Sequence, residues 1–177
     1  MNRTLRTLTA GLATALVLVL GGCSMFVNSR AVEYRDETER LYTAIAEQVP
    51  KDLTRIGPYV ESRWAFLDTL PGREEARYGY WRIVDERSFI DDVGTSERVA
   101  AIIDAYLRSE GFTYERIATR NEGTSFSDGY RRAEDDSEGW FVRVIWNTTV
   151  PDRAEGMQIY VESPLTPRGD DPLEPGL

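Results

Sequence analysis

The 177-residue sequence contains no histidine, one cysteine and one lysine. Histidine is the commonest general base and metal ligand in proteins, so its absence excludes a Ser-His-Asp triad and a histidine-based metal site. A single cysteine can form neither a disulfide within the chain nor a cysteine-based zinc site. A Ser-Lys dyad would require Lys51, which follows Pro50 at a predicted helix junction. These absences predict a protein that is not an enzyme.

Basic charge is also scarce, with 21 basic residues against 30 acidic residues and a net charge of −9. Nucleic-acid phosphates require a basic face, so this balance predicts that the chain does not bind nucleic acid. The sequence has no glycine-rich phosphate loop with a lysine and no dinucleotide-binding motif after a strand. We therefore predict neither a cofactor nor a resident metal.

Long apolar runs are absent except near the N-terminus, where residues 8–20 are apolar apart from threonines. This run is shorter than the ~20 residues that a bilayer-spanning helix needs. Arg3 and Arg6 precede it without any acidic residue, and Gly21-Gly22 follows it. A basic start, an apolar run and small residues, in that order, are typical of a secretory signal peptide.

The sequence Leu20-Gly21-Gly22-Cys23 resembles the lipobox of bacterial lipoproteins. The resemblance implies that the signal is cut before Cys23 and that the Cys23 thiol carries a diacylglyceryl group. Two acyl chains anchor a protein stably, since each buried CH₂ contributes ~0.8 kcal/mol. The resemblance thus implies a signal peptide over residues 1–22, followed by a lipidated cysteine and tether over residues 23–30. The alternative, an ordinary secreted protein, would retain an unpaired thiol.

Cleavage before Cys23 would remove two arginines and no acidic residue, leaving 19 basic and 30 acidic residues and a net charge of −11. Anionic lipid headgroups would not attract such a chain, so the lipid alone would anchor it. Arginine outnumbers lysine twenty to one, which is typical of GC-rich coding. With the lipobox, the chain is similar to small lipoproteins of high-GC Gram-positive bacteria, which face outward from the cell membrane.

The spacing of apolar residues predicts two main helices. The first covers residues 31–49, and Pro50 marks either its end or the start of a short helical piece through Ile56, which Gly57-Pro58 would break. The second covers residues 97–110, with Thr95 or Ser96 as its N-cap and Gly111-Phe112 as its stop.

Alternating apolar residues predict several strands, most of them in the C-terminal half. The predicted strands cover residues 78–84, 112–119, 124–131, 140–147 and 157–162. We therefore predict an α+β domain over residues 31–163, in which an antiparallel β-meander sheet carries the two helices on one face. The proline-rich residues 164–177 are predicted to form a disordered tail.

Carboxylates are the only abundant reactive groups. Asp91-Asp92 and the Glu134-Asp135-Asp136 cluster offer oxygen ligands for a cation such as Ca²⁺, but they lack the alternating spacing of a calcium loop. The pattern favours solvated acidic turns. A glycosidase with two catalytic carboxylates is a third-ranked interpretation, because no particular pair stands out.

Aromatic residues provide the remaining candidate contacts. Trp140 and Trp146 share the inward face of one predicted strand, which favours a place in the core. Tyr59 and Trp64 lie in less regular sequence and, with Trp81, are the candidate ligand contacts.

Two hypotheses for function follow. In the first, the chain is a non-catalytic lipoprotein at the extracytoplasmic face of the cell membrane that binds a partner protein or an envelope component. In the second, it is a ligand-binding lipoprotein with an aromatic groove for a glycan, peptide or lipid.

Overall fold

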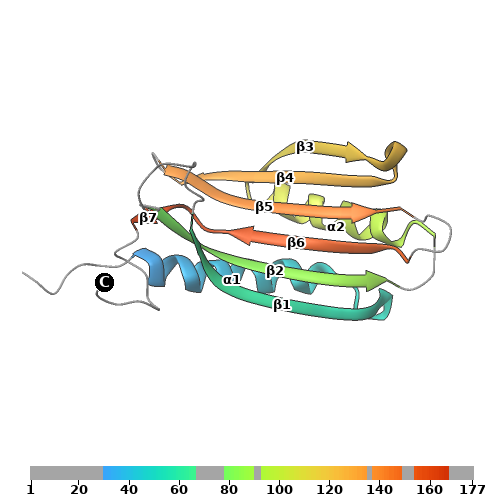
Figure 1. Cartoon of the computed structure of the whole chain (residues 1–177), viewed down its shortest axis with the longest axis horizontal. Coiled ribbons are helices and arrows are strands. Elements are labelled where there is room, and N and C mark those ends of the chain that lie inside the picture. The colour runs from blue at the N-terminus through green and yellow to red at the C-terminus, as the bar shows by residue number, and fades with distance from the viewer. Residues whose placement is uncertain (1–29, 67–77, 90–92, 135–136, 149–153, 168–177) are drawn as a thin grey trace, which may run out of the picture.

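A computed structural model describes residues 30–66, 78–89, 93–134, 137–148 and 154–167, and these form an α+β fold (Figure 1). The α+β class predicted from the sequence is confirmed. The elements are α1 (Arg30–Gln48), β1 (Thr54–Phe66), β2 (Tyr78–Phe89), α2 (Thr95–Ser109), β3 (Thr113–Arg120), β4 (Ser125–Glu134), β5 (Ser137–Asn147), β6 (Gly156–Glu162) and β7 (Thr166–Pro167). Neither helix in the described part of the chain is long and apolar enough to cross a membrane.

The main sheet is antiparallel, with the strand order β1-β2-β6-β5-β4-β3. Strands β3 to β6 are neighbours in both sequence and space, so they form a meander. Strand β2, from the N-terminal half of the chain, pairs with the last long strand, β6, and thereby joins the two halves of the domain. The two-residue strand β7 also pairs with β2.

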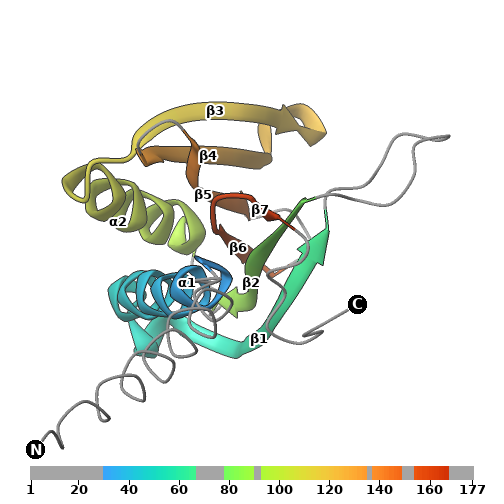
Figure 2. The same ribbon diagram turned by 90° about the vertical axis from the view of Figure 1, so that its left-hand side faces the viewer.

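Each helix buries one apolar stripe. In α1, Leu41 and Ile45 are fully buried, and in α2 the same holds for Ile103 and Leu107. These side chains belong to one core cluster with inward-facing residues of β2, β5 and β6. Figure 2 shows both helices on the same side of the sheet.

The end of α2 follows the predicted pattern. Gly111 has a φ of 83°, which glycine adopts without steric cost. The backbone N–H of Phe112 donates to the Leu107 carbonyl at 3.0 Å, and the Phe112 side chain is buried. This left-handed glycine followed by a hydrophobic contact is a common helix stop.

The start of α2 differs from the prediction, because the cap is not Thr95 or Ser96. The helix begins after Gly94, and the buried Glu155 carboxylate accepts hydrogen bonds from the backbone N–H groups of Gly94 at 2.8 Å and Ser96 at 2.7 Å. A carboxylate suits this position because the helix N-terminus carries partial positive charge. The capping residue lies some sixty residues further along the chain, so local sequence does not indicate it.

The region after α1 also corrects the prediction. Only a short 3₁₀ turn (Lys51–Leu53) follows α1, and the chain then enters the long edge strand β1. Gly57-Pro58 lies where the pairing of β1 with β2 shifts register, between Ile56 and Tyr59. An edge strand tolerates proline because its missing N–H need not contribute to the sheet. The dipeptide therefore marks an irregularity within a strand and not the end of an element.

Close backbone approach explains the glycine at position 57. Its φ is 103°, and a Cβ atom there would lie 2.5 Å from the Glu86 carbonyl oxygen of β2. A side chain at this position would therefore separate β1 from β2.

The described domain extends past the predicted boundary at residue 163. Ser163 and Thr166 are buried, and the Ser163 hydroxyl accepts a hydrogen bond from the Trp81 backbone N–H at 2.9 Å. The rest of the predicted tail, residues 168–177, lies outside the described residues. So do the signal peptide and lipobox and the acidic residues Asp91, Asp92, Asp135 and Asp136.

Candidate functional site

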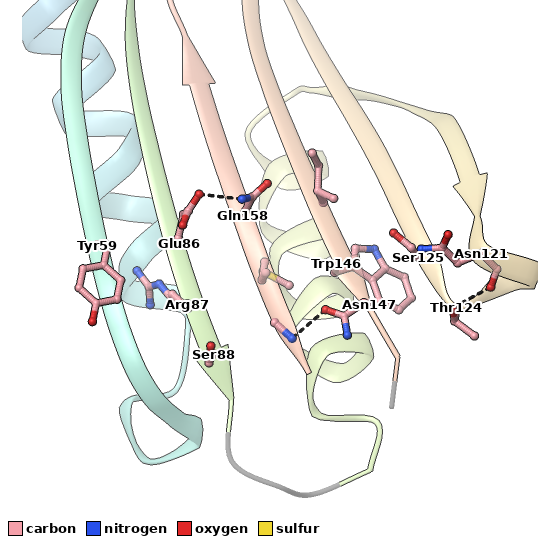
Figure 3. Close-up of a pocket in the computed structure, with 13 residues that line it drawn as sticks. Tyr59, Glu86, Arg87, Ser88, Asn121, Thr124, Ser125, Trp146, Asn147 and Gln158 are labelled. Carbon is pink, nitrogen blue, oxygen red and sulfur yellow. Dashed lines mark hydrogen bonds between the residues drawn. The ribbon is translucent and has the colours of Figure 1, made fainter. Parts of the chain in front are cut away.

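Figure 2 shows one face of the sheet without a described helix. A groove lies on this face, and Figure 3 shows the residues that line it. Side chains alternate along each strand, so the neighbours of the inward core residues point to this face. The groove encloses about 430 Å³. Its described lining comes from five strands and the turn between β3 and β4, and includes Tyr59, Glu86, Asn121, Thr124, Ser125, Ile145, Asn147 and Gln158.

Tyr59 forms one wall of this groove. It projects from the edge strand β1, is 67% exposed, and is paired with Glu86 of β2 across the two strands. Figure 3 shows its ring at one side of the groove, with Asn121 and Thr124 at the other. A tyrosine ring offers an apolar surface together with a hydroxyl, which suits contact with a partly polar ligand.

The groove floor is a chain of hydrogen-bonded polar side chains. The Gln158 amide donates to Glu86 Oε1 at 2.7 Å, and its oxygen accepts from the Tyr160 hydroxyl at 3.2 Å. These two hydrogen bonds orient the Gln158 amide, and the Glu86 carboxylate remains exposed at the surface. At the end of the groove, Asn147 Oδ1 accepts from the Gly156 N–H at 2.9 Å and holds β5 to β6.

Few acidic groups line the groove. Among the described residues that line the groove, Glu86 is the sole carboxylate, whereas glycoside hydrolysis by acid and base uses a pair. The described residues also contain no group of three or more histidine, cysteine, aspartate or glutamate residues that could hold a metal ion.

A buried ion pair lies under the groove on the helix-covered face. Arg87 Nη2 donates to Asp85 Oδ2 at 2.5 Å and Arg87 Nε donates to the same atom at 2.9 Å. The Tyr42 hydroxyl of α1 donates to Asp85 Oδ2 at 3.1 Å. Burial, followed by the nearby Asp85 charge, raises the pKa of Tyr42 to about 12, so this donor keeps its proton at neutral pH.

Sequence reasoning missed this ion pair because the predicted strand ended at residue 84, one residue before Asp85. The strand continues to Phe89, and its alternation places Trp81, Ile83, Asp85 and Arg87 on the same buried face. The sequence did contain a signal for this pair. Asp85 and Arg87 have opposite charges and lie two residues apart, so they share one face if the strand is extended past residue 84.

The three predicted ligand contacts, Tyr59, Trp64 and Trp81, lie in different environments. Tyr59 is exposed and lines the groove, and its contact with a ligand stays a prediction. Trp81 is not an exposed contact, because its side chain is 5% exposed and packs with Ile83 on the inward face of the sheet. The Trp64 backbone pairs with Trp81, while its side chain lies outside the described residues. Trp140 and Trp146 are buried in the core, as the strand alternation favoured.

Comparison with known proteins adds no relative: the chain matches no protein-family model, no curated protein and no solved structure.

Proposed function

We propose that this chain is a non-catalytic lipoprotein, anchored through Cys23 at the extracytoplasmic face of the cell membrane, that binds an envelope component. The observation that carries the binding proposal is the groove on the uncovered sheet face. It combines the exposed Tyr59 ring with an ordered row of amide, carboxylate and hydroxyl groups. Its volume of about 430 Å³ falls within the range of small-ligand sites. A short glycan or peptide segment matches this size and polarity.

Replacing Tyr59 with alanine tests the groove directly. Loss of the ring is expected to weaken the binding of soluble cell-wall glycan and peptide fragments by about two- to twelvefold. An aromatic contact contributes about 0.5–1.5 kcal/mol, and about 1.4 kcal/mol corresponds to a factor of ten in affinity. Isothermal titration calorimetry on the detergent-solubilised protein measures the effect.

Val60→Ala is the matched control, because Val60 is the next residue of β1, is also exposed, and lies outside the groove lining. Tyr59→Phe separates the contribution of the ring from that of the hydroxyl. Equal weakening by the alanine substitutions at positions 59 and 60 would count against the groove, and so would the absence of binding by every fragment.

A second candidate function is docking of a partner protein along the edge strand β1. The observation in its favour is that Ile56, Tyr59 and Val60 are all exposed on this strand. Edge strands present unpaired backbone groups that a partner strand can bind. Crosslinking and pull-down of the tagged protein from intact cells distinguishes the two functions, because a stoichiometric protein partner is expected only in the second.

The anchor gives a separate prediction. Cys23→Ala is expected to abolish retention of the processed protein at the membrane, so that the chain is either released or left uncleaved. The reason is that no other residue can carry the diacylglyceryl group of the lipobox resemblance. Cell fractionation and intact-mass measurement test this. Unchanged processing and retention in the Cys23→Ala variant would contradict the anchor.

A further inference from the structure

A second cleft, of about 400 Å³, lies on the helix-covered side of the sheet, between α2 and the β3–β4 hairpin. The small side chains of Ala100 and Ala101 on α2 leave space there. Across the cleft, Phe126 of β4 stacks on Trp146 of β5, with ring centroids 4.3 Å apart. Two arginines, one from β3 and one from α2, line this cleft and are held in a similar way.

Arg116 lies over the aromatic rings of the cleft. Its guanidinium carbon is 4.8 Å from the Phe126 ring centroid and 5.8 Å from that of Trp146. Its Nε is 2.5 Å from Asp128 Oδ1 and also donates to the Tyr114 hydroxyl at 3.0 Å. The side chain remains 37% exposed.

Asp128 holds Arg116 from a buried position. It also accepts hydrogen bonds from Trp146 Nε1 at 2.7 Å and from the Tyr114 hydroxyl at 3.0 Å. Because three groups of the domain converge on this one carboxylate, its orientation is fixed, and the Arg116 guanidinium is fixed with it.

Arg108 of α2 is held by similar contacts. Its Nε donates to both oxygens of Asp104, at 3.0 and 2.8 Å, and its guanidinium carbon lies 4.8 Å from the Tyr114 ring centroid. The Tyr114 ring thus supports Arg108, while its hydroxyl contacts Arg116. Neither arginine donates a hydrogen bond from Nη1 or Nη2 to a residue in the described ranges.

From this geometry we infer that the cleft binds an oxyanion, a phosphate or carboxylate group of a ligand, through the terminal Nη groups of Arg108 and Arg116. The planar end of a guanidinium matches the paired oxygens of such groups. Aromatic stacking and the Nε contacts fix both guanidinium groups before a ligand binds, which lowers the entropy lost on binding. Free phosphate esters and lipid headgroups both carry this chemistry. The inference is independent of the groove, so either site can fail alone.

The Trp146 indole N–H is a reporter for the test, since it is hydrogen-bonded to Asp128 within the cleft. We would follow its NMR resonance in the detergent-solubilised protein during titration with inorganic phosphate, glycerol phosphate and succinate. Saturable shifts are expected with at least one ion. The apparent Kd is expected to rise at least tenfold in Arg116→Lys and Arg108→Lys, because lysine lacks the planar fork.

Arg131→Lys is the matched control, because Arg131 is an exposed arginine over an aromatic ring, 4.5 Å from the Phe141 centroid, outside the cleft lining. Arg108 is half exposed, so its substitution tests binding without disturbing the core. An unchanged Trp140 resonance verifies the fold of each variant. No saturable shift with any of the three ions would overturn the inference, as would an equal loss of affinity in Arg131→Lys.

Reconstitution distinguishes the two sources of the oxyanion. Phosphatidic acid exposes a terminal phosphate group, whereas choline caps the phosphate of phosphatidylcholine. A Trp146 shift in nanodiscs that contain phosphatidic acid, but not in nanodiscs of phosphatidylcholine alone, would therefore support a lipid headgroup. Saturable binding of the soluble ions without any such difference would support a soluble ligand.

Discussion

Replacing Asp85 with asparagine is expected to lower the free energy of unfolding by about 3–5 kcal/mol, the range for breaking a buried ion pair. Asp85 is fully buried, and the Arg87 side chain that it pairs with is 6% exposed. Asparagine nearly preserves the shape but removes the charge. The Arg87 guanidinium would then stay buried without a counter-charge, and the Tyr42 hydroxyl would lose its carboxylate acceptor.

Urea unfolding followed by circular dichroism measures this loss. Asp104→Asn is the control, because the Asp104–Arg108 pair is part-exposed and surface pairs contribute only about 0–1 kcal/mol. The double variant Asp85→Asn/Arg87→Met removes both charges and is expected to recover part of the lost stability. A loss in Asp85→Asn no larger than that in Asp104→Asn would show that the buried pair has no special role.

Replacing Glu155 with alanine is expected to lower the free energy of unfolding by about 2–3 kcal/mol. The buried carboxylate satisfies two backbone N–H groups at the start of α2, and hydrogen bonds to charged groups contribute about 1.5–3 kcal/mol. The Glu155 backbone carbonyl also accepts from the Phe89 N–H at 2.9 Å, and alanine preserves that contact. The loss therefore reports on the side chain alone.

Thermal unfolding and amide hydrogen exchange in the first turn of α2 measure this effect. Glu97→Ala is the control, because Glu97 is an exposed acidic residue in the same first turn and its interaction with the helix dipole is about 0.3–1 kcal/mol. Faster exchange at Ser96 in the Glu155 variant alone is expected. Equal effects of the two substitutions would mean that the long-range cap contributes no more than the local charge.

Sequence patterns that act over a few residues predicted much of the fold. The apolar stripes of α1 and α2, the glycine stop at Gly111 and the alternation in β5 all depend on neighbours within one or two turns or strand repeats. The structure has helices α1 and α2 and strand β5 at the predicted places, and Gly111 lies in the left-handed conformation just after α2. Tyr59, which the sequence suggested as an exposed contact, also lies in the candidate groove.

Other features depend on which strands become neighbours. A Gly-Pro dipeptide usually ends a helix or a strand. Gly57-Pro58 is accommodated within β1 because β1 is an edge strand. The groove exists only because β1, β2, β6, β5 and the β3–β4 turn lie side by side.

The sequence by itself determined the two helices, the strands of the C-terminal half and the α+β class, because hydrophobic periodicity is a local property of the chain. It also determined which reactive side chains the chain lacks, because composition follows directly from the sequence. Only the tertiary structure decided that Trp81 points inward, that Asp85 is buried against Arg87, and that Glu155 caps α2. A strand's alternation defines two faces without saying which one is covered, and hydrogen bonds between residues sixty positions apart leave no local pattern.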